Sequence, residues 1–313
     1  MLATAWPHPF AGRGWHFEPK WDGIRGVLAW DGRVVTLHTR TDAEVSARYP
    51  ELAPDPHLAP CVVDGEVVVL AGGRASFERL QQRAALAPAG MRDHPVSFVA
   101  FDLLHLGARS LLGTPIEERR RLLDGLGLGG PFVTVAPVAD GTALWEVVVG
   151  RDLEGMVAKR AASPYRPGVR SADWRKVAHL HTVKAVVGGF TPGEGGRSRS
   201  FGALALGLWD GLRLRWIGNV GSGFGDRQLE AIRAALDEMR RPDSAFHPDP
   251  ELPAMTAVEP ALVAAVDYRN WTTAGRIRHP RFKGFTDDAV DAVTWEQEGP
   301  DRVVGPTSST LDP

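Results

Sequence analysis

The stretch Glu18-Pro19-Lys20-Trp21-Asp22-Gly23-Ile24-Arg25 is the most informative part of this 313-residue chain. Only five of the 36 basic residues are lysines, so a lysine in a tight, glycine-containing segment calls for a chemical reason. An amine can act as a nucleophile, whereas a guanidinium keeps its proton. Lys20 is therefore a candidate for covalent chemistry. The alternative for so short a segment is an ordinary surface turn.

Length and composition set the class of protein. About two domains are expected from 313 residues, and 43% hydrophobic residues is ordinary for a globular chain. No apolar run approaches the roughly 18 residues that span a membrane, and residues 1–15 lack a signal-peptide pattern. Cys61 is the only cysteine, which excludes an intrachain disulfide and a cysteine-based zinc site. We expect a cytoplasmic, monomeric protein with no membrane contact.

Charge argues against a uniformly basic coat for nucleic acid, because the net charge is −2. Any contact with DNA must then come from local patches. Arginine is dense at residues 119–121, where we expect a solvated helix face. Basic residues gather again between Lys159 and Lys176, and this cluster carries more weight because it coincides with the motifs described below.

The first half of the chain mixes short strands with helices. Asp31-Gly32 between two apolar runs predicts a hairpin, and Ser76 can cap a helix that extends to about Arg83. Thr114-Pro115-Ile116-Glu117 resembles a capping box with proline at the first helical position. The predicted strands are residues 27–30, 34–39, 62–70, 96–106 and 155–159.

The second half has a different texture. Short strands at residues 185–190, 203–209 and 212–220 alternate with glycine-rich turns, and one helix is expected at about residues 227–239. That pattern suits a small β-barrel with an inserted helix, such as an OB-fold. We expect domains at residues 1–182 and 183–298, followed by a loose tail at residues 299–313.

Motifs in a fixed order resemble those of the ATP-dependent DNA ligases, members of the covalent nucleotidyltransferase superfamily. Lys-x-Asp-Gly-x-Arg at residues 20–25 resembles their nucleotidyl-attachment motif. The chain is most similar to stand-alone bacterial ligases and to the ligase module of end-joining enzymes. The further matching segments are residues 37–42, 49–52, 63–66, 98–104, 153–160, 165–168, 170–176, 186–190, 218–224 and 278–284.

The resemblance implies an α+β fold, with an ATP-grasp-like nucleotidyltransferase domain followed by an OB-fold barrel. It implies an enzyme that uses ATP and Mg²⁺ or Mn²⁺ to seal nicks or joined ends in DNA, through a lysyl-AMP and then a DNA-adenylate. The expected partners are nicked or broken double-stranded DNA and end-joining repair proteins. A role in DNA repair or recombination is favoured over replication.

The resemblance also assigns roles in nucleotide binding. Lys20 takes the AMP, and Asp22 assists catalysis after adenylation or merely caps a turn. Glu18 positions the adenine. Phe101 stacks on the adenine, although a core position in an apolar strand is almost as good a reading; Phe98 is left in the core.

Phosphate and metal contacts complete the implied site. Arg25 and Arg170 belong to the nucleotide pocket, Arg40 also holds the 5′-phosphate of the nick, and Lys176 contacts the α-phosphate. As isolated residues, each of these would be read as a surface charge. Glu66 and Glu154 are the candidate metal ligands, with Glu66 also near the ribose; the alternative is a pair of exposed strand-end carboxylates. Neighbouring cations and the metal would favour the neutral lysine amine.

Two motifs depart from the family pattern. The fifth motif usually ends in Lys-x-Lys, whereas this chain has Lys176-Val177-Ala178. The sixth usually reads Arg-x-Asp-Lys, whereas residues 286–289 are Thr-Asp-Asp-Ala. Three cations are missing, which puts the efficiency of the ATP step in question.

Two rival functions follow. An RNA ligase or a capping nucleotidyltransferase shares Lys-x-Asp-Gly, but Tyr165-Arg166-Pro167-Gly168 and the glycine motifs of the second half favour a DNA ligase. A catalytically weakened DNA-binding scaffold would explain the missing cations, but the retention of Lys20 opposes it.

Overall fold

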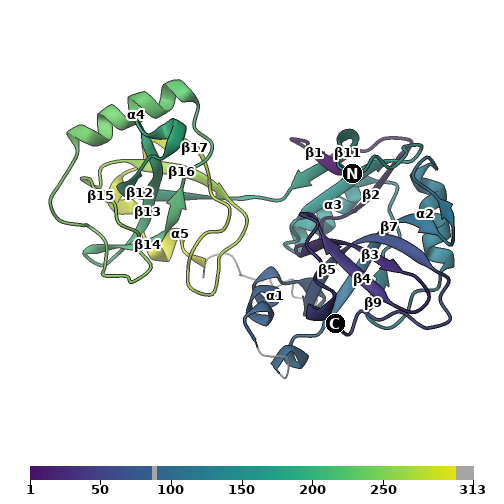
Figure 1. Cartoon of the computed structure of the whole chain (residues 1–313). Coiled ribbons are helices and arrows are strands. Elements are labelled where there is room, and N and C mark those ends of the chain that lie inside the picture. Colours follow the sequence, from purple (N-terminus) through teal and green to yellow (C-terminus); the bar gives the residue numbers. More distant parts are fainter. Residues whose placement is uncertain (87–89, 301–313) are drawn as a thin grey trace, which may run out of the picture. The chain divides into compact units, whose positions relative to one another are not determined.

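The computed structural model describes residues 1–86 and 90–300. The chain divides into two compact units, Met1–His179 and the part from Leu180 onward (Figure 1). Of the predicted tail, only Gly299 and Pro300 fall within the described residues. None of the helices in the described ranges is both long and apolar enough to cross a membrane.

The larger sheet of the first unit has the strand order β4-β3-β5-β7-β8, with β6 beside β5 and β9 beside β7. The predicted hairpin is confirmed: β3 and β4 pair directly, and the Asp31 carboxylate accepts hydrogen bonds of 2.7 Å from the N–H groups of Arg33 and Val34. The strands are β3 (Ile24–Trp30), β4 (Val35–Thr39), β5 (Cys61–Ala71), β6 (Arg74–Ala75), β7 (Val96–Leu106), β8 (Arg109–Ser110) and β9 (Phe132–Thr134).

A second sheet has the order β1-β11-β10-β2. Its strands are β1 (Leu2–Ala5), β2 (Trp15–Pro19), β10 (Gly155–Arg160) and β11 (Arg170–Ala178). β1 runs parallel to β11 and places Leu2 opposite Arg170, so the two ends of this unit meet in one sheet. β2 leads directly into the Lys20 segment and then into β3, which connects the two sheets.

Helices α1 (Phe77–Ala84), α2 (Ile116–Gly125) and α3 (Gly141–Gly150) complete this unit, with 3-10 turns at Ser46–Arg48 and Gly90–Asp93. Ser76 caps α1 as predicted, by accepting a bond from the Arg79 N–H. The predicted capping box is wrong. Pro115 is the N-cap residue of α2 and makes no side-chain cap bond, and the Thr114 carbonyl accepts a bond from the Arg119 guanidinium instead.

The solvated arginine face predicted for α2 is also wrong. Arg119 is fully buried and Arg120 is 3% exposed, because α2 packs on β7. Arg119 forms a two-pronged pair with the buried Asp102 carboxylate at 2.7 and 2.8 Å, and Arg120 donates to the Ala100 carbonyl at 3.3 Å. Only Arg121 of the three arginines is exposed.

The second unit is a curled antiparallel sheet of order β14-β13-β12-β16-β17, with β15 beside β12. The predicted strands and inserted helix are present, and their buried side chains form one core that includes Phe190, Leu206 and Phe246. The elements are β12 (His181–Pro192), β13 (Phe201–Asp210), β14 (Arg213–Val220), α4 (Asp226–Glu238), β15 (Thr256–Ala257), β16 (Val263–Tyr268), β17 (Arg281–Thr286) and α5 (Trp295–Glu298), with 3-10 turns at Gly195–Arg197 and Val290–Ala292.

Candidate active site

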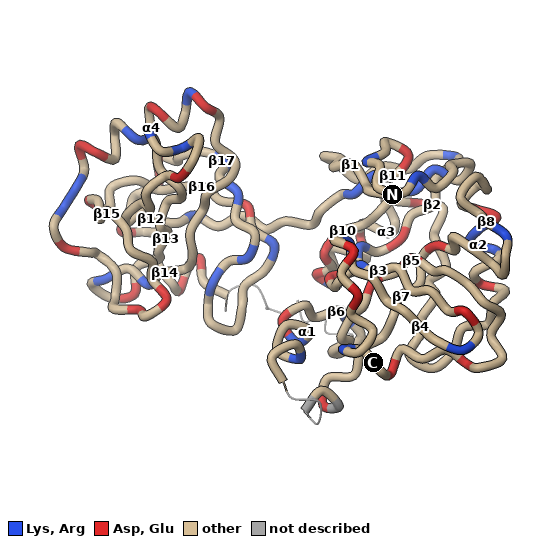
Figure 2. Tube along the Cα trace, in the orientation of Figure 1, with Lys and Arg blue, Asp and Glu red and all other residues tan. Residues whose placement is uncertain are grey.

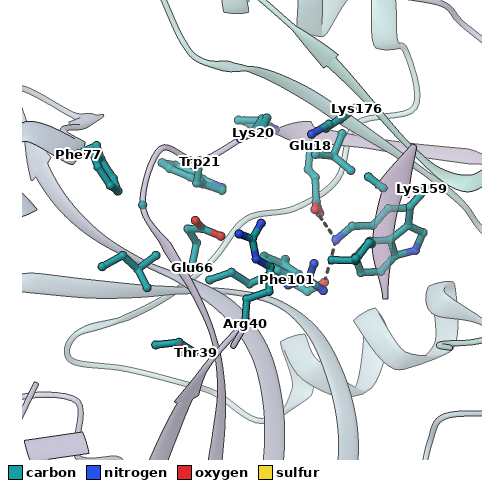
Figure 3. Close-up of a pocket in the computed structure, with 18 of the residues that line it drawn as sticks. Glu18, Lys20, Trp21, Thr39, Arg40, Glu66, Phe77, Phe101, Lys159 and Lys176 are labelled. Atoms are coloured by element: carbon teal, nitrogen blue, oxygen red, sulfur yellow. Dashed lines mark hydrogen bonds and ion pairs between the residues drawn. The ribbon is translucent and has the colours of Figure 1, made fainter. Parts of the chain in front are cut away.

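A cavity of about 590 Å³ in the first unit collects most of the predicted site residues (Figure 3). Its lining combines cations, a buried carboxylate and aromatic rings, which suits a nucleotide. Asp22 is not among the lining residues, and Glu154 reaches the site only through its ion pair with Lys20. The predicted residues that line the cavity are Glu18, Lys20, Arg25, Arg40, Glu66, Phe101, Arg170 and Lys176.

Backbone packing explains the glycine after Lys20. The ideal Cβ of any other residue at Gly23 would lie 2.2 Å from the Val67 carbonyl oxygen of β5. The glycine therefore lets the chain pass tightly over β5 as it turns from β2 into β3. This crossing places Lys20, which follows β2, and Arg25 of β3 on the same cavity although the two strands belong to different sheets.

Lys20 contacts a second tightly packed segment, Glu154-Gly155, through both its backbone and its side chain. Its N–H donates to the Gly155 carbonyl at 2.9 Å, and its ammonium group pairs with the Glu154 carboxylate. Gly155, the first residue of β10, has φ +146°, and a Cβ there would lie 2.1 Å from the Val177 carbonyl oxygen of β11. Only glycine therefore fits at this position. The Glu154-Gly155 pair thus fixes a carboxylate beside the amine.

Strand alternation places the cations of β11. Trp174 and Lys176 are two positions apart on β11, so their side chains share the face that lines the cavity, and Arg170 at the start of the strand lines it as well. Burial, followed by repulsion from Lys20 and Arg170, lowers the pKa of Lys176. The Arg170 side chain is exposed, and its guanidinium donates to the Ala3 carbonyl at 2.6 Å. This concentration of positive charge suits a polyphosphate.

Glu66 is a half-buried carboxylate that lines the cavity. Burial raises its pKa to about 8, with Glu154 adding to the rise and Lys20 opposing it. Two carboxylates that disfavour each other's charge in a cavity suit a divalent cation, which takes oxygen ligands. The residues present therefore fit the metal that the family implies.

Lys159 is a site residue that the sequence interpretation left within a charge cluster. It is 2% exposed, forms an ion pair with Glu18 and lies 4.2 Å from the centroid of the Phe101 ring and 4.4 Å from that of Trp174 (Figure 3). Burial lowers its pKa, although Glu18 opposes this effect. The rarity of lysine could have identified it, because three of the five lysines line this cavity.

Trp174 is the second residue that was missed. Its ring lies 6.3 Å from that of Phe101 at 78°, and both rings line the cavity. Phe101 is only 9% exposed, so it is both a core residue and a wall of the cavity, whereas Phe98 is wholly buried, as expected.

Comparison with known protein families matches both units. The model of the ATP dependent DNA ligase domain matches residues 1–178, more than half of the chain, and the model of the ATP dependent DNA ligase C terminal region matches residues 197–289. The chain belongs to the ATP-dependent DNA ligase family. The predictions of this family and of its fold class are confirmed.

Individual ligases are similar over almost the whole chain. DNA ligase C1 of Mycolicibacterium smegmatis is 33% identical over 95% of this chain and 88% of its own length. The multifunctional non-homologous end joining DNA repair protein LigD of Mycobacterium tuberculosis is 39% identical over 88% of this chain. The chain spans only 36% of the length of that protein.

A solved structure of mycobacterial DNA ligase D complexed with ATP and MES is 34% identical. It matches 94% of this ligase-family chain and 96% of its own chain, with a TM-score of 0.54.

Proposed function

We propose that this protein seals nicks or joined ends in double-stranded DNA through a lysyl-AMP on Lys20, and that it serves end-joining repair. The observation that carries the proposal is one cavity that contains Lys20 together with an aromatic wall, a buried carboxylate and several cations. Similarity to an end-joining protein and to stand-alone ligases supports the repair role. In this proposal residues 1–182 form the adenylation domain and residues 183–298 the OB-fold domain.

The proposed reaction has three steps, each of which is a nucleotidyl or phosphoryl transfer. The neutral amine of Lys20 attacks the α-phosphate of ATP, a P–N bond forms, and the P–O bond to pyrophosphate breaks. The 5′-phosphate of the nick then takes the AMP from Lys20. The 3′-hydroxyl attacks that phosphate and expels AMP. Positioning and neutralisation of phosphate charge supply most of the catalysis in such transfers.

The cavity residues take separate parts of the nucleotide. Phe101 stacks on the adenine, and Glu18, held by Lys159, accepts from its amino group. Arg25 and Arg170 hold ribose or phosphate oxygens, and Lys176 meets the α-phosphate. Arg40 is exposed at the rim, where it can hold the 5′-phosphate of the nick. Asp22 assists after adenylation.

Glu66 and Glu154 would hold Mg²⁺ or Mn²⁺, which would neutralise phosphate charge. Glu154 also orients the Lys20 amine through their ion pair. The amine must give up a proton before it attacks, because only the neutral form is a nucleophile.

The adduct tests this proposal directly. Lys20→Arg is expected to form no covalent AMP adduct with labelled ATP, because arginine keeps the charge but cannot act as the amine. Lys283→Arg in β17, where Lys283 pairs with Asp267 in the second unit, is the matched control and should form the adduct normally. An adduct of normal yield on Lys20→Arg would refute the assignment.

The rival enzymes are separated by substrate. Adenylation with ATP but not GTP excludes a capping enzyme, and sealing of nicked DNA in preference to nicked RNA excludes an RNA ligase. A wild-type chain that binds DNA but neither forms the adduct nor seals an adenylated nick would be a scaffold.

A further inference from the structure

Arg25 is held from behind by a buried carboxylate. Its guanidinium donates to both oxygens of Asp64, at 3.0 Å from Nε and 2.6 Å from Nη2. Asp64 is fully buried in β5, whereas the Arg25 side chain is 22% exposed and lines the cavity. One edge of the guanidinium is therefore fixed inside the protein, and the remaining N–H groups are available to a ligand in the cavity.

Tyr165 supplies the third hydrogen bond to this carboxylate. Its hydroxyl donates to Asp64 Oδ2 at 2.8 Å, and the Arg25 Nη2 lies 3.4 Å from the same hydroxyl oxygen. Burial, followed by the charge of Asp64, raises the pKa of Tyr165 above its ordinary value, so the phenol remains a donor. The residue thus completes a triangle with Asp64 and Arg25.

The position of Tyr165 is itself fixed. The side chain is 6% exposed, its N–H donates to the Leu112 carbonyl at 2.8 Å, and its ring packs edge-on against Trp174 with centroids 5.9 Å apart. It lies between β10 and β11, far in sequence from Asp64. A hydroxyl fixed at this point hinders rotation of the Asp64 carboxylate about its Cβ–Cγ bond.

Arg25 has little else to orient it. Its guanidinium carbon lies 5.5 Å from the centroid of the Phe101 ring and 5.6 Å from that of Trp174, and such contacts attract a cation without fixing the direction of its N–H groups. The hydrogen bonds to Asp64 set that direction.

We propose that Tyr165 is a positioning residue for the nucleotide: its hydroxyl fixes Asp64, and Asp64 aims Arg25 at an oxygen of the bound ATP. This inference rests on the proposed ligase function. Tyr165 does not touch the reacting atoms, so its loss should weaken the hold on ATP in the ground state and the transition state alike. Such a loss raises KM and leaves kcat unchanged.

Tyr165→Phe tests the inference, because it removes the hydroxyl and keeps the ring against Trp174. We expect the KM for ATP in single-turnover adduct formation to rise about 3- to 10-fold, the size of one ordinary hydrogen bond, with kcat within about 2-fold. Tyr49→Phe is the matched control. Tyr49 is also buried in this unit, and its ring faces Arg83 rather than the cavity.

A double-mutant cycle shows the route of the effect. Arg25→Lys keeps the charge but loses the two-pronged bond, so Tyr165→Phe should add little to the KM of Arg25→Lys. Additive effects would overturn the proposal, since Tyr165 would then act without Arg25. An unchanged KM in Tyr165→Phe, or a fall in kcat alone, would also overturn it.

The remaining outcomes are equally decisive. A KM shift of the same size in Tyr49→Phe, with a matching fall in Tm, would assign the effect to general stability and overturn the proposal. A wild-type chain that forms no adduct would refute the proposed function itself, and this inference with it. Adduct formation by the wild type with a normal KM in Tyr165→Phe would refute the inference alone.

Discussion

The surroundings of the Glu66 carboxyl disfavour its charged form, so the free energy of unfolding depends on pH through this residue. Its pKa rises from 4.5 to about 8 in the folded chain, because burial and then Glu154 outweigh the opposing Lys20. The folded chain therefore holds a proton on Glu66 between about pH 4.5 and pH 8 that the unfolded chain has lost. The contribution of Glu66 to the free energy of unfolding is complete below that window and falls as the pH rises through it.

Glu66→Gln is expected to remove this dependence. In metal-free buffer the variant should unfold at a higher temperature than the wild type at pH 8.5, by about 2–4 °C for each kcal/mol gained, and should show no such gain at pH 4.5. Thermal unfolding at both pH values measures it, with Glu230→Gln on the exposed face of α4 as the control. Equal gains at both pH values would contradict the assignment.

A single site residue could be predicted from the sequence where its residue type is rare in this chain. Lysine is rare, and the sequence singled out Lys20 for that reason, whereas Lys176 was assigned through its motif. Lys159 was counted within the basic cluster and its motif, but it was given no role of its own. What distinguishes it, burial against Phe101 and a bond to Glu18, depends on strands that meet only in the folded chain.

Among the elements, helix α2 carries a charged side chain on its buried face. Arg119 and Asp102 are both fully buried, and the guanidinium also donates to the carbonyls of Thr114 and Ser163. The pair holds α2 against β7 and against the segment that leads to Tyr165. Removing one partner would leave the other as an uncompensated buried charge.

Arg119→Met should therefore lower the free energy of unfolding by about 3–5 kcal/mol. Arg121→Met, two residues along the same helix on an exposed position, should change it by no more than about 0.5 kcal/mol. Urea unfolding of the two variants gives the comparison. Similar, small effects of both substitutions would mean that the buried pair contributes nothing that methionine packing does not replace.

Elements made of neighbours in sequence were predictable, and those made of distant segments were not. The bounds of β7 coincide with the predicted strand, and the Asp31-Gly32 hairpin is present. β1 and β2 had no local signal, because β1 pairs with β11 more than 160 residues away. The buried face of α2 escaped prediction for the same reason, since Asp102 lies on another element.

For the whole molecule, the basic cluster between Lys159 and Lys176 is not one surface. Arg170 and Lys176 line the cavity, whereas Arg175 lies on the opposite face of β11 and stacks between Trp6, at 3.9 Å, and Trp15, at 4.5 Å. Figure 2 shows Lys and Arg interspersed with Asp and Glu along the chain. This cluster therefore offers DNA phosphates no single basic face.

Because cations are missing from the fifth and sixth motifs, we expect the ATP step to be the weak one. Ala178 follows Lys176 by two residues on β11, so it lies on the same face, but it brings no charge. In the second unit Thr286 ends β17, and Lys184, a cation close to that run, is paired with Asp288 at 2.6 Å. Pyrophosphate leaves with several negative charges, so fewer cations raise the barrier to adenylation above that to nick sealing.

We therefore expect the wild-type chain to form the Lys20 adduct slowly but to seal a nick supplied already adenylated at a better-preserved rate. Ala178→Lys should speed adduct formation about 10-fold or more, because it adds a cation beside Lys176 for the phosphates of ATP. Thr286→Arg with Ala289→Lys should speed it as well if the second domain closes on the nucleotide as the resemblance to the family implies. Sealing of the adenylated nick should change much less. The comparison is the rate of adduct formation against the rate of sealing for each variant, with Ala234→Lys on the exposed side of α4 as the control for added charge. Fast adenylation by the wild type would show that Lys159, Lys176 and their neighbours suffice without the missing cations.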